Sequence, residues 1–345
     1  MAKTTTHSPV NSSVVAQIRD IMRLIVQYEL APSVNNATAA PPYTQQRVII
    51  NSVFSSGSYG IEEIIKRLRI IDAFYTTNAS FNYFSFEEMA QAIAALGSAQ
   101  AANDYFYDIA CGRPDSKGLF SKPYGIQKNL QTGSKKLSLL SKYAYYCLLQ
   151  NPSKYPLGFP IYDSLAQSAY TVVCRMIGLK PVSNTALTAT IEAYVAGLDQ
   201  LRTAIFGQGN ALFLGIQQFD VLDAYLWRMG KFEFGNLSLL LDEADYKIFV
   251  NNIGLAGSPL SSFDKAVQRV LAAPGTRSPF AGTSNQTYLD ALYQHWVLFH
   301  KTRITKQQSA IGTPATTTPQ STSAPAKATN SPATEDQQTK ITKKL

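Results

Sequence analysis

A lysine and an aspartate in the middle of the chain, Lys142 and Asp163, are the residue pair best suited to covalent chemistry. Lys142 lies in a helix predicted over residues 135–149, and Asp163 follows the next loop at the predicted start of another helix. A buried lysine that loses its proton attacks an electrophilic carbon and forms a Schiff base, and a neighbouring carboxylate moves protons for it. Two ordinary roles stay open for these residues: an exposed helix lysine and a plain helix cap.

The stretch that contains this lysine is strongly basic. Residues 116–162 contain seven lysines and no acidic residue, in a chain whose formal net charge is +8. Positive charge concentrated in this way favours an anionic partner such as a nucleic acid. The alternative is a solvated basic face, because lysines are common on protein surfaces. The lysines are Lys117, Lys122, Lys128, Lys135, Lys136, Lys142 and Lys154.

Within this stretch, Gly133 and Ser134 predict a tight turn between two helices. Gly133 tolerates the positive φ of such a turn, and Ser134 is a natural cap for the helix that follows. The start of a helix has exposed N–H groups and a partial positive charge, which suit a phosphate group. Tyrosines alternate with the lysines here, a composition that holds phosphates and stacks bases. The residues predicted to bind a nucleic acid are Tyr124, Lys128, Gly133, Ser134 and Lys136.

Apolar residues recur at helical spacing along most of the chain, and period-two alternation is nearly absent, so the sequence predicts an all-α fold. Residues 45–54 fit a strand or a helix. The chain has 345 residues, 45% of them hydrophobic, which is ample for a core. Helices are expected near residues 14–30, 59–75, 86–96, 99–111, 125–130, 135–149, 165–177, 187–206, 217–229, 243–251, 262–271 and 287–300.

The predicted organisation is a short flexible N-terminus (1–11), one folded domain (12–306) and a disordered, basic tail (307–345). The tail has too few apolar side chains to offset the entropy lost on ordering. We expect no membrane span and a cytoplasmic location, since the sequence shows neither a long apolar run nor a signal-peptide core. We also expect no structural metal, because the three cysteines and the pair His295 and His300 lack metal-ligand spacing.

Several short motifs resemble the helix-hairpin-helix DNA glycosylase superfamily, in particular bacterial proteins related to 8-oxoguanine DNA glycosylase. The resemblance covers roughly residues 68–230. The hairpin departs from the family's usual Pro-Gly-hydrophobic-Gly core and has Gln131-Thr132-Gly133 in its place. The motifs are Leu130-x-x-Gly133-Ser134-Lys135, Ser141-Lys142-Tyr143, Asn151-Pro152 and Phe159-Pro160-Ile161-Tyr162-Asp163-Ser164. Two further stretches lie where the family has its flanking helices: Ile71-Asp72-Ala73-Phe74-Tyr75-Thr76-Thr77-Asn78 and Leu222-Asp223-Ala224-Tyr225-Leu226-Trp227.

This resemblance implies DNA binding through the hairpin and a monovalent cation, and removal of a damaged base in base excision repair, with or without lyase activity. It further implies that a lysine of the second hairpin helix attacks C1′ of a flipped nucleotide, assisted by Asp163. Two lysines remain candidates for this role. Lys135 matches the local Gly-x-Lys pattern, whereas Lys142 has a separation from Asp163 closer to the family's.

Base flipping needs an aromatic pocket, and Phe219, Tyr225 and Trp227 are the candidates for its walls; their alternative is the core of a helix. A second reading of the whole chain keeps the same scaffold without catalysis, as a nucleic-acid-binding or protein-interaction module. A third is a helical module whose basic segment meets a protein or an acidic lipid. The sequence gives no indication of the oligomeric state.

Overall fold

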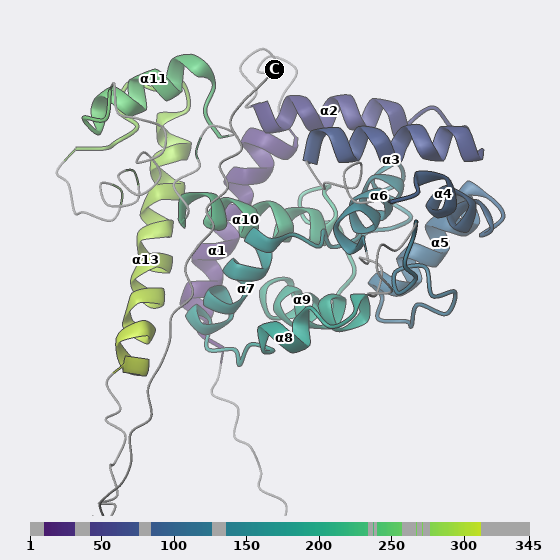
Figure 1. Cartoon of the computed structure of the whole chain (residues 1–345). Coiled ribbons are helices and arrows are strands. Elements are labelled where there is room, and N and C mark those ends of the chain that lie inside the picture. The colour runs from purple at the N-terminus through teal and green to yellow at the C-terminus, as the bar shows by residue number, and fades with distance from the viewer. Residues whose placement is uncertain are drawn as a thin grey trace, which may run out of the picture.

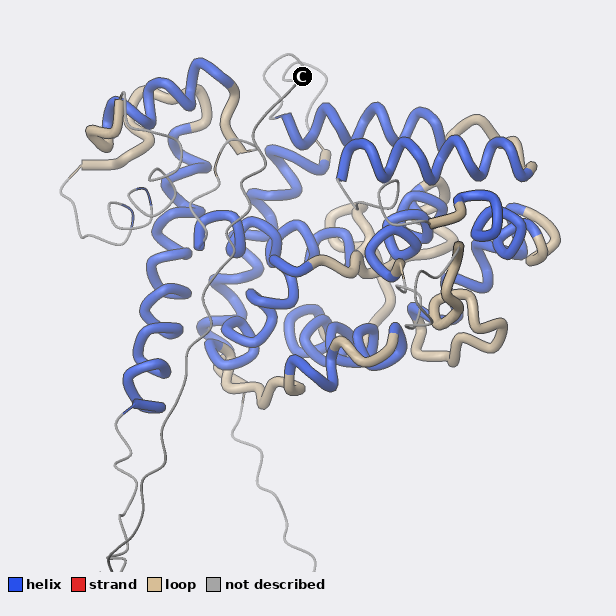
Figure 2. Tube along the Cα trace, viewed as in Figure 1, coloured by secondary structure: helices blue, strands red, loops and turns tan. Residues whose placement is uncertain are grey.

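The computed structural model describes residues 10–31, 42–75, 84–125, 136–233, 237, 240–256, 267, 271 and 277–311. Within these residues the chain is all-helical, as predicted (Figures 1 and 2), and its only β-pairing is an isolated bridge between Phe213 and Ile216. No helix in this part is long and apolar enough to cross a membrane. The predicted hairpin around residues 126–135 and the tail beyond residue 311 lie outside the described residues.

The observed helices differ from the predicted ones mainly at their ends. The undecided segment at 45–54 is helical, the helix expected over 187–206 is split in two, and the last helix continues beyond residue 306. The elements are α1 (Ser12–Ile25), its π-helical continuation η1 (Val26–Leu30), α2 (Pro42–Phe54), α3 (Ile61–Tyr75), α4 (Phe86–Ala94), α5 (Ala99–Ala110), α6 (Leu137–Leu149), α7 (Ser164–Met176), α8 (Asn184–Leu187), α9 (Ile191–Phe206), α10 (Gln218–Glu233), α11 (Glu243–Asn252) and α13 (Gln286–Ile311).

Short polar side chains cap several of these helices, as the sequence predicts. Asp163 caps α7, its Oδ1 accepting hydrogen bonds from the backbone N–H groups of Leu165 (2.8 Å) and Ala166 (3.3 Å). Ser85 caps α4 through the N–H of Glu88. The Glu88 carboxylate does not complete a capping box; it accepts a hydrogen bond from the N–H of Gly125 (2.9 Å) and so ties α4 to the loop before residue 126.

Two helices, α6 and α10, form the centre of the molecule and are buried along nearly their whole length. On one side, α6 packs against α2, α3 and α5; on the other, α10 packs against α1, α7 and α13 (Figure 1). The crossing of α7 and α10 depends on Gly230. A Cβ there would lie 2.8 Å from the Cβ of Leu165, so only glycine allows this approach.

The non-helical segment between α6 and α7 runs through the core and determines where Asp163 sits. Residues 155 and 157–161 of this segment are buried, so their backbone polar groups need partners inside the protein. Side chains and backbone groups from α6, α9 and the start of α10 provide them. The bonds are Tyr162 N–H to Ser141 Oγ (2.9 Å), Tyr194 hydroxyl to Ile161 O (2.7 Å), Phe219 N–H to Leu157 O (2.8 Å) and Gln217 Nε2 to Tyr155 O (2.8 Å).

Candidate functional site

Lys142 is a buried lysine in the middle of α6, with only 3% of its surface exposed. Its Nζ donates a hydrogen bond to Ser138 Oγ (2.6 Å) and lies 5.1 Å from the centre of the Tyr75 ring. Burial lowers the pKa of Lys142, and the negative charges of Asp163 and Asp223 partly oppose this shift. The amine is therefore easier to deprotonate than that of an exposed lysine, which is the first requirement for a lysine nucleophile.

Asp223, on α10, is the carboxylate that sequence reasoning did not select. It is 7% exposed, and its Oδ1 has no hydrogen-bond partner within the described part of the chain. Burial, reinforced by the negative charge of Asp163, raises the pKa of Asp223 well above its usual range, while Lys142 opposes the rise. Each of the two groups therefore opposes the pKa shift that burial causes in the other.

Asp163 acts on two lysines at once. Besides Lys142, its charge opposes the burial-induced lowering of the pKa of Lys231 on α10. Lys231 is 8% exposed, and its Nζ lies 4.9 Å from the centre of the Trp227 ring. Because both bonds of the α7 cap use Oδ1, the cap leaves Oδ2 of Asp163 available to these neighbours.

Lys142 and Asp163 therefore interact electrostatically, and Asp223 and Lys231 join this group, although no ion pair within 4 Å links these side chains in the described part of the chain. The sequence did contain a signal for Asp223, since an aspartate interrupts an otherwise apolar run, Val221-Leu222-Asp223-Ala224-Tyr225-Leu226, and such carboxylates are rarely buried without a partner. The competing nucleophile, Lys135, lies outside the described residues, as do three of the predicted DNA contacts: Lys128, Gly133 and Ser134.

Two of the three predicted base-pocket residues are core residues in the structure. Phe219 and Tyr225 are both 0% exposed, because α10 is covered by other helices on nearly all sides. The Tyr225 hydroxyl is hydrogen-bonded to Nε2 of His295 (2.7 Å). Trp227 differs, being half-buried with its ring beside Lys231. Of the proposed walls, only Trp227 is thus partly accessible near the lysines and carboxylates.

Positive charge gathers around three aromatic rings at the two ends of the segment 126–135. Lys122 lies over the ring of Tyr124 (5.8 Å), Lys136 over that of Phe84 (5.9 Å), and Arg69 over that of Phe86 (5.7 Å). The rings touch one another, with centroids 5.0 Å apart for the two phenylalanines and 6.2 Å apart for Phe84 and Tyr124. We call these six residues the basic aromatic cluster.

The predicted contacts Tyr124 and Lys136 both belong to this cluster, but in different ways. Tyr124 is 5% exposed and its hydroxyl donates a hydrogen bond to Leu119 O (2.8 Å). It therefore forms the buried part of the cluster. Lys136 is partly exposed at the start of α6. Elsewhere in the basic stretch, Lys154 pairs with Asp104 (3.1 Å).

The described residues contain no group of three or more His, Cys, Asp or Glu side chains arranged to hold a metal ion. No protein-family model, curated protein or solved structure matches this chain. The resemblance to the glycosylases therefore stays a prediction.

Proposed function

We propose that the protein binds DNA and removes a base from it as an N-glycosylase, with Lys142 as the nucleophile. One observation carries this proposal: a buried lysine with a lowered pKa shares its surroundings with the carboxyl groups of Asp163 and Asp223. An amine nucleophile needs desolvation to lose its proton and a neighbouring acid or base to move that proton. Titratable groups with perturbed pKa values that interact electrostatically are typical of such sites.

In the proposed reaction, the neutral amine of Lys142 attacks C1′ of a nucleotide, and the bond from C1′ to the base breaks. The base leaves with the electron pair of that bond, and the protonated carboxyl of Asp223 is suited to give it a proton. One proton of the attached amine then moves to O4′ as the C1′–O4′ bond of the sugar ring breaks, and this gives a cationic imine that the carboxylate of Asp163 stabilises. Water then releases the sugar and restores the amine, or a further elimination cleaves the strand, as in a lyase.

The basic aromatic cluster supports a DNA partner for this chemistry. Its three cations surround the ends of residues 126–135, the segment expected to contact the DNA backbone, and Lys136 is six residues before Lys142 on the chain. Cations placed over aromatic rings favour both phosphates and stacked bases. Since Lys142 is 3% exposed, a bound nucleotide has to displace the contacts of Nζ with Ser138 and Tyr75.

Borohydride reduction tests the nucleophile directly, since it traps a Schiff base between an amine and a sugar. We expect the full chain to become linked to oligonucleotides that carry an abasic site or a damaged base. The variant Lys142→Ala should abolish the adduct, whereas Lys135→Ala and Lys136→Ala should retain it. Trapping that survives Lys142→Ala and disappears with Lys135→Ala would assign the role to the other candidate.

A second function, DNA binding without catalysis, is favoured by the tight packing of the Lys142 ammonium against Ser138 Oγ and the Tyr75 ring. These contacts suit a structural cation. Binding alone predicts that log affinity falls linearly with log salt concentration and that the triple variant Lys128→Ala, Lys135→Ala, Lys136→Ala reduces this slope. If log affinity falls linearly with log salt concentration and no substrate is trapped, the protein binds DNA without catalysis. If the triple variant has the same slope as the wild type, the hairpin does not bind the DNA backbone.

A further inference from the structure

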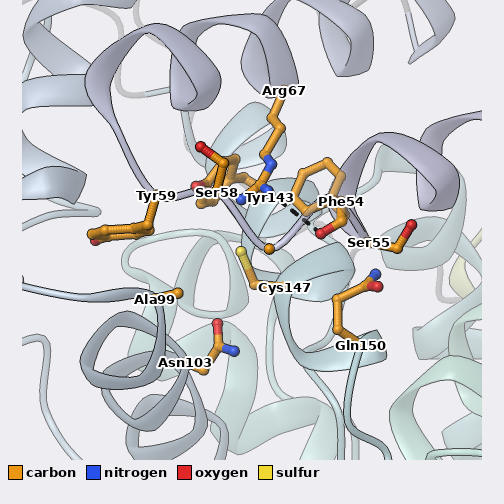
Figure 3. Close-up of a pocket in the computed structure, with 11 residues that line it drawn as sticks. Phe54, Ser55, Ser58, Tyr59, Arg67, Ala99, Asn103, Tyr143, Cys147 and Gln150 are labelled. Atoms are coloured by element: carbon orange, nitrogen blue, oxygen red, sulfur yellow. Dashed lines mark hydrogen bonds between the residues drawn. The ribbon is translucent and has the colours of Figure 1, made fainter.

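A second site lies on another face of α6, in a cavity of about 340 Å³ between α3, α5, α6 and the α2–α3 connection (Figure 3). Its mouth is formed by exposed small residues of the connection, Ser55 and Ser58 among them. Its inner wall contains Tyr143 and Cys147, one turn apart on α6, together with the guanidinium of Arg67. Neither Lys142 nor Asp163 lines it.

Arg67 is 4% exposed and only partly satisfied in this wall. Its Nη2 donates to Ser56 Oγ (3.1 Å) and weakly to the carbonyl of Phe54 (3.4 Å), and the guanidinium lies 5.2 Å from the centre of the Phe54 ring. Its Nε has no hydrogen-bond partner within the described residues. The carboxylate of Glu63 stays 3.6 Å from this Nε and the same distance from Nζ of Lys66, so one negative charge is shared between two cations.

The other ionisable groups in the wall are neutral. Burial raises the pKa of the Tyr143 phenol well above its usual range and that of the Cys147 thiol to about 12. No acidic residue lines the cavity, and Asn103 adds an amide. The cavity therefore combines one incompletely paired positive charge with neutral hydrogen-bond donors and the apolar rings of Phe54 and Tyr59.

A buried guanidinium with an unfilled donor is costly to keep unless an anion completes its hydrogen bonds. The cavity volume lies at the lower end of the range for small-molecule sites, about 300–1,000 Å³. In Figure 3 the side chains of Arg67, Tyr143 and Phe54 lie close together, and Tyr59 and Asn103 line the cavity from other sides.

We propose that this cavity binds a small organic anion, whose carboxylate or phosphate group pairs with the guanidinium of Arg67 beside the phenol of Tyr143. The apolar part of the ligand packs against Phe54 and Tyr59, and the serines of the connection face its polar edge. The site is separate from Lys142, and the proposal does not depend on the proposed reaction with DNA.

The test uses three probes of similar size on the full chain: phenyl phosphate, benzoate and the uncharged benzyl alcohol. Ligand-observed NMR titration should show binding of at least one anion, with benzyl alcohol at least about tenfold weaker, as expected for the loss of one charged hydrogen bond. The comparison of phenyl phosphate with benzoate identifies the anionic group. No binding of either anion at about 10 mM, or equal binding of all three probes, overturns the proposal.

Two variants locate the anion. Arg67→Gln should weaken its binding at least about tenfold. Ala99→Phe fills the cavity from α5 and leaves Arg67 in place, so it should also abolish anion binding. If Arg67→Gln does not fold, Ala99→Phe alone tests the location of the anion. Lys247→Ala removes an exposed charge on α11, outside both the cavity and the basic aromatic cluster, and serves as the control that should bind like the wild type. Unchanged anion binding in a folded Ala99→Phe variant refutes the assignment to this cavity.

Discussion

Glu29 and Arg228 form an ion pair at the centre of the molecule, where both side chains are almost completely buried. Nε of Arg228 donates to Oε1 of Glu29 (2.8 Å), and the hydroxyl of Tyr288 donates to the same oxygen. The pair joins three helical elements that are far apart in the sequence: η1, α10 and α13. Glu29 lies in η1, the π-helical turn that ends the first helix, and is buried there together with Val26.

The variant Glu29→Gln should destabilise the fold by about 3–5 kcal/mol, because it removes the negative charge that Glu29 places beside the buried Arg228 guanidinium. Urea denaturation measures the change. The control is Glu87→Gln, which breaks the exposed pair between Glu87 and Arg69 (3.5 Å) and should cost less than about 1 kcal/mol. Equal losses of unfolding free energy in the two variants would show that the buried pair stabilises the fold no more than the exposed pair does.

The helices were predictable from the sequence because their signals are local. Ser85 and Asp163 are caps that bond groups two or three residues away, and the apolar spacing of residues 61–75 defines a buried face without reference to the rest of the chain. The undecided segment at 45–54 is different, since its β-branched residues fit either structure. It is a helix because it packs against α3 and α6, a tertiary contact that no local pattern contains.

The candidate site was predictable only in part, for the same reason. Lys142 and Asp163 stood out by residue type and spacing, but the burial of Lys142 near Tyr75 of α3 and the opposing charge of Asp223 on α10 involve residues far away along the chain. Asp223 contributes through that long-range packing. The aromatic residues Phe219 and Tyr225 were expected to line a pocket, yet a helix surrounded on nearly all sides buries them in the core.

His295 should make the protein less stable in mild acid. Burial lowers its pKa from 6.5 to about 4, so below pH 6.5 the unfolded chain takes up a proton that the folded chain does not. Protonation then favours unfolding, and the penalty grows as the pH falls towards 4, reaching roughly 3 kcal/mol. Above pH 6.5 the side chain is neutral in both states and contributes no pH dependence.

The variant His295→Gln isolates this contribution, because glutamine is neutral at every pH and still offers a polar group to the hydroxyl of Tyr225. Denaturation at pH 7 and at pH 4.5 gives four unfolding free energies. The difference between wild type and variant should shift by roughly 2–3 kcal/mol in favour of the variant at the lower pH. A difference that is the same at both pH values would mean that His295 is protonated in the folded protein.

Asp223 should affect stability with the opposite dependence on pH. Its pKa is raised on folding, first by burial and then by Asp163, so at a pH above the ordinary value of 3.8 the folded chain binds a proton that the unfolded chain has lost. Stability from this group is greatest near pH 4 and falls as the pH rises through the raised pKa. The isosteric variant Asp223→Asn lacks the titration, and it should therefore gain stability relative to the wild type at pH 8 but not at pH 4.

The same variant separates two roles that Asp223 can have in the proposed reaction. If Asp223 supplies a proton during base release, Asp223→Asn should slow base release on an intact damaged base more than it slows borohydride trapping on an abasic site, where no base leaves. Glu62→Gln, an exposed change on α3, should alter neither rate nor the pH dependence of stability. Equal slowing of both reactions by Asp223→Asn would assign Asp223 to the positioning of Lys142, because loss of a positioned amine affects every substrate alike.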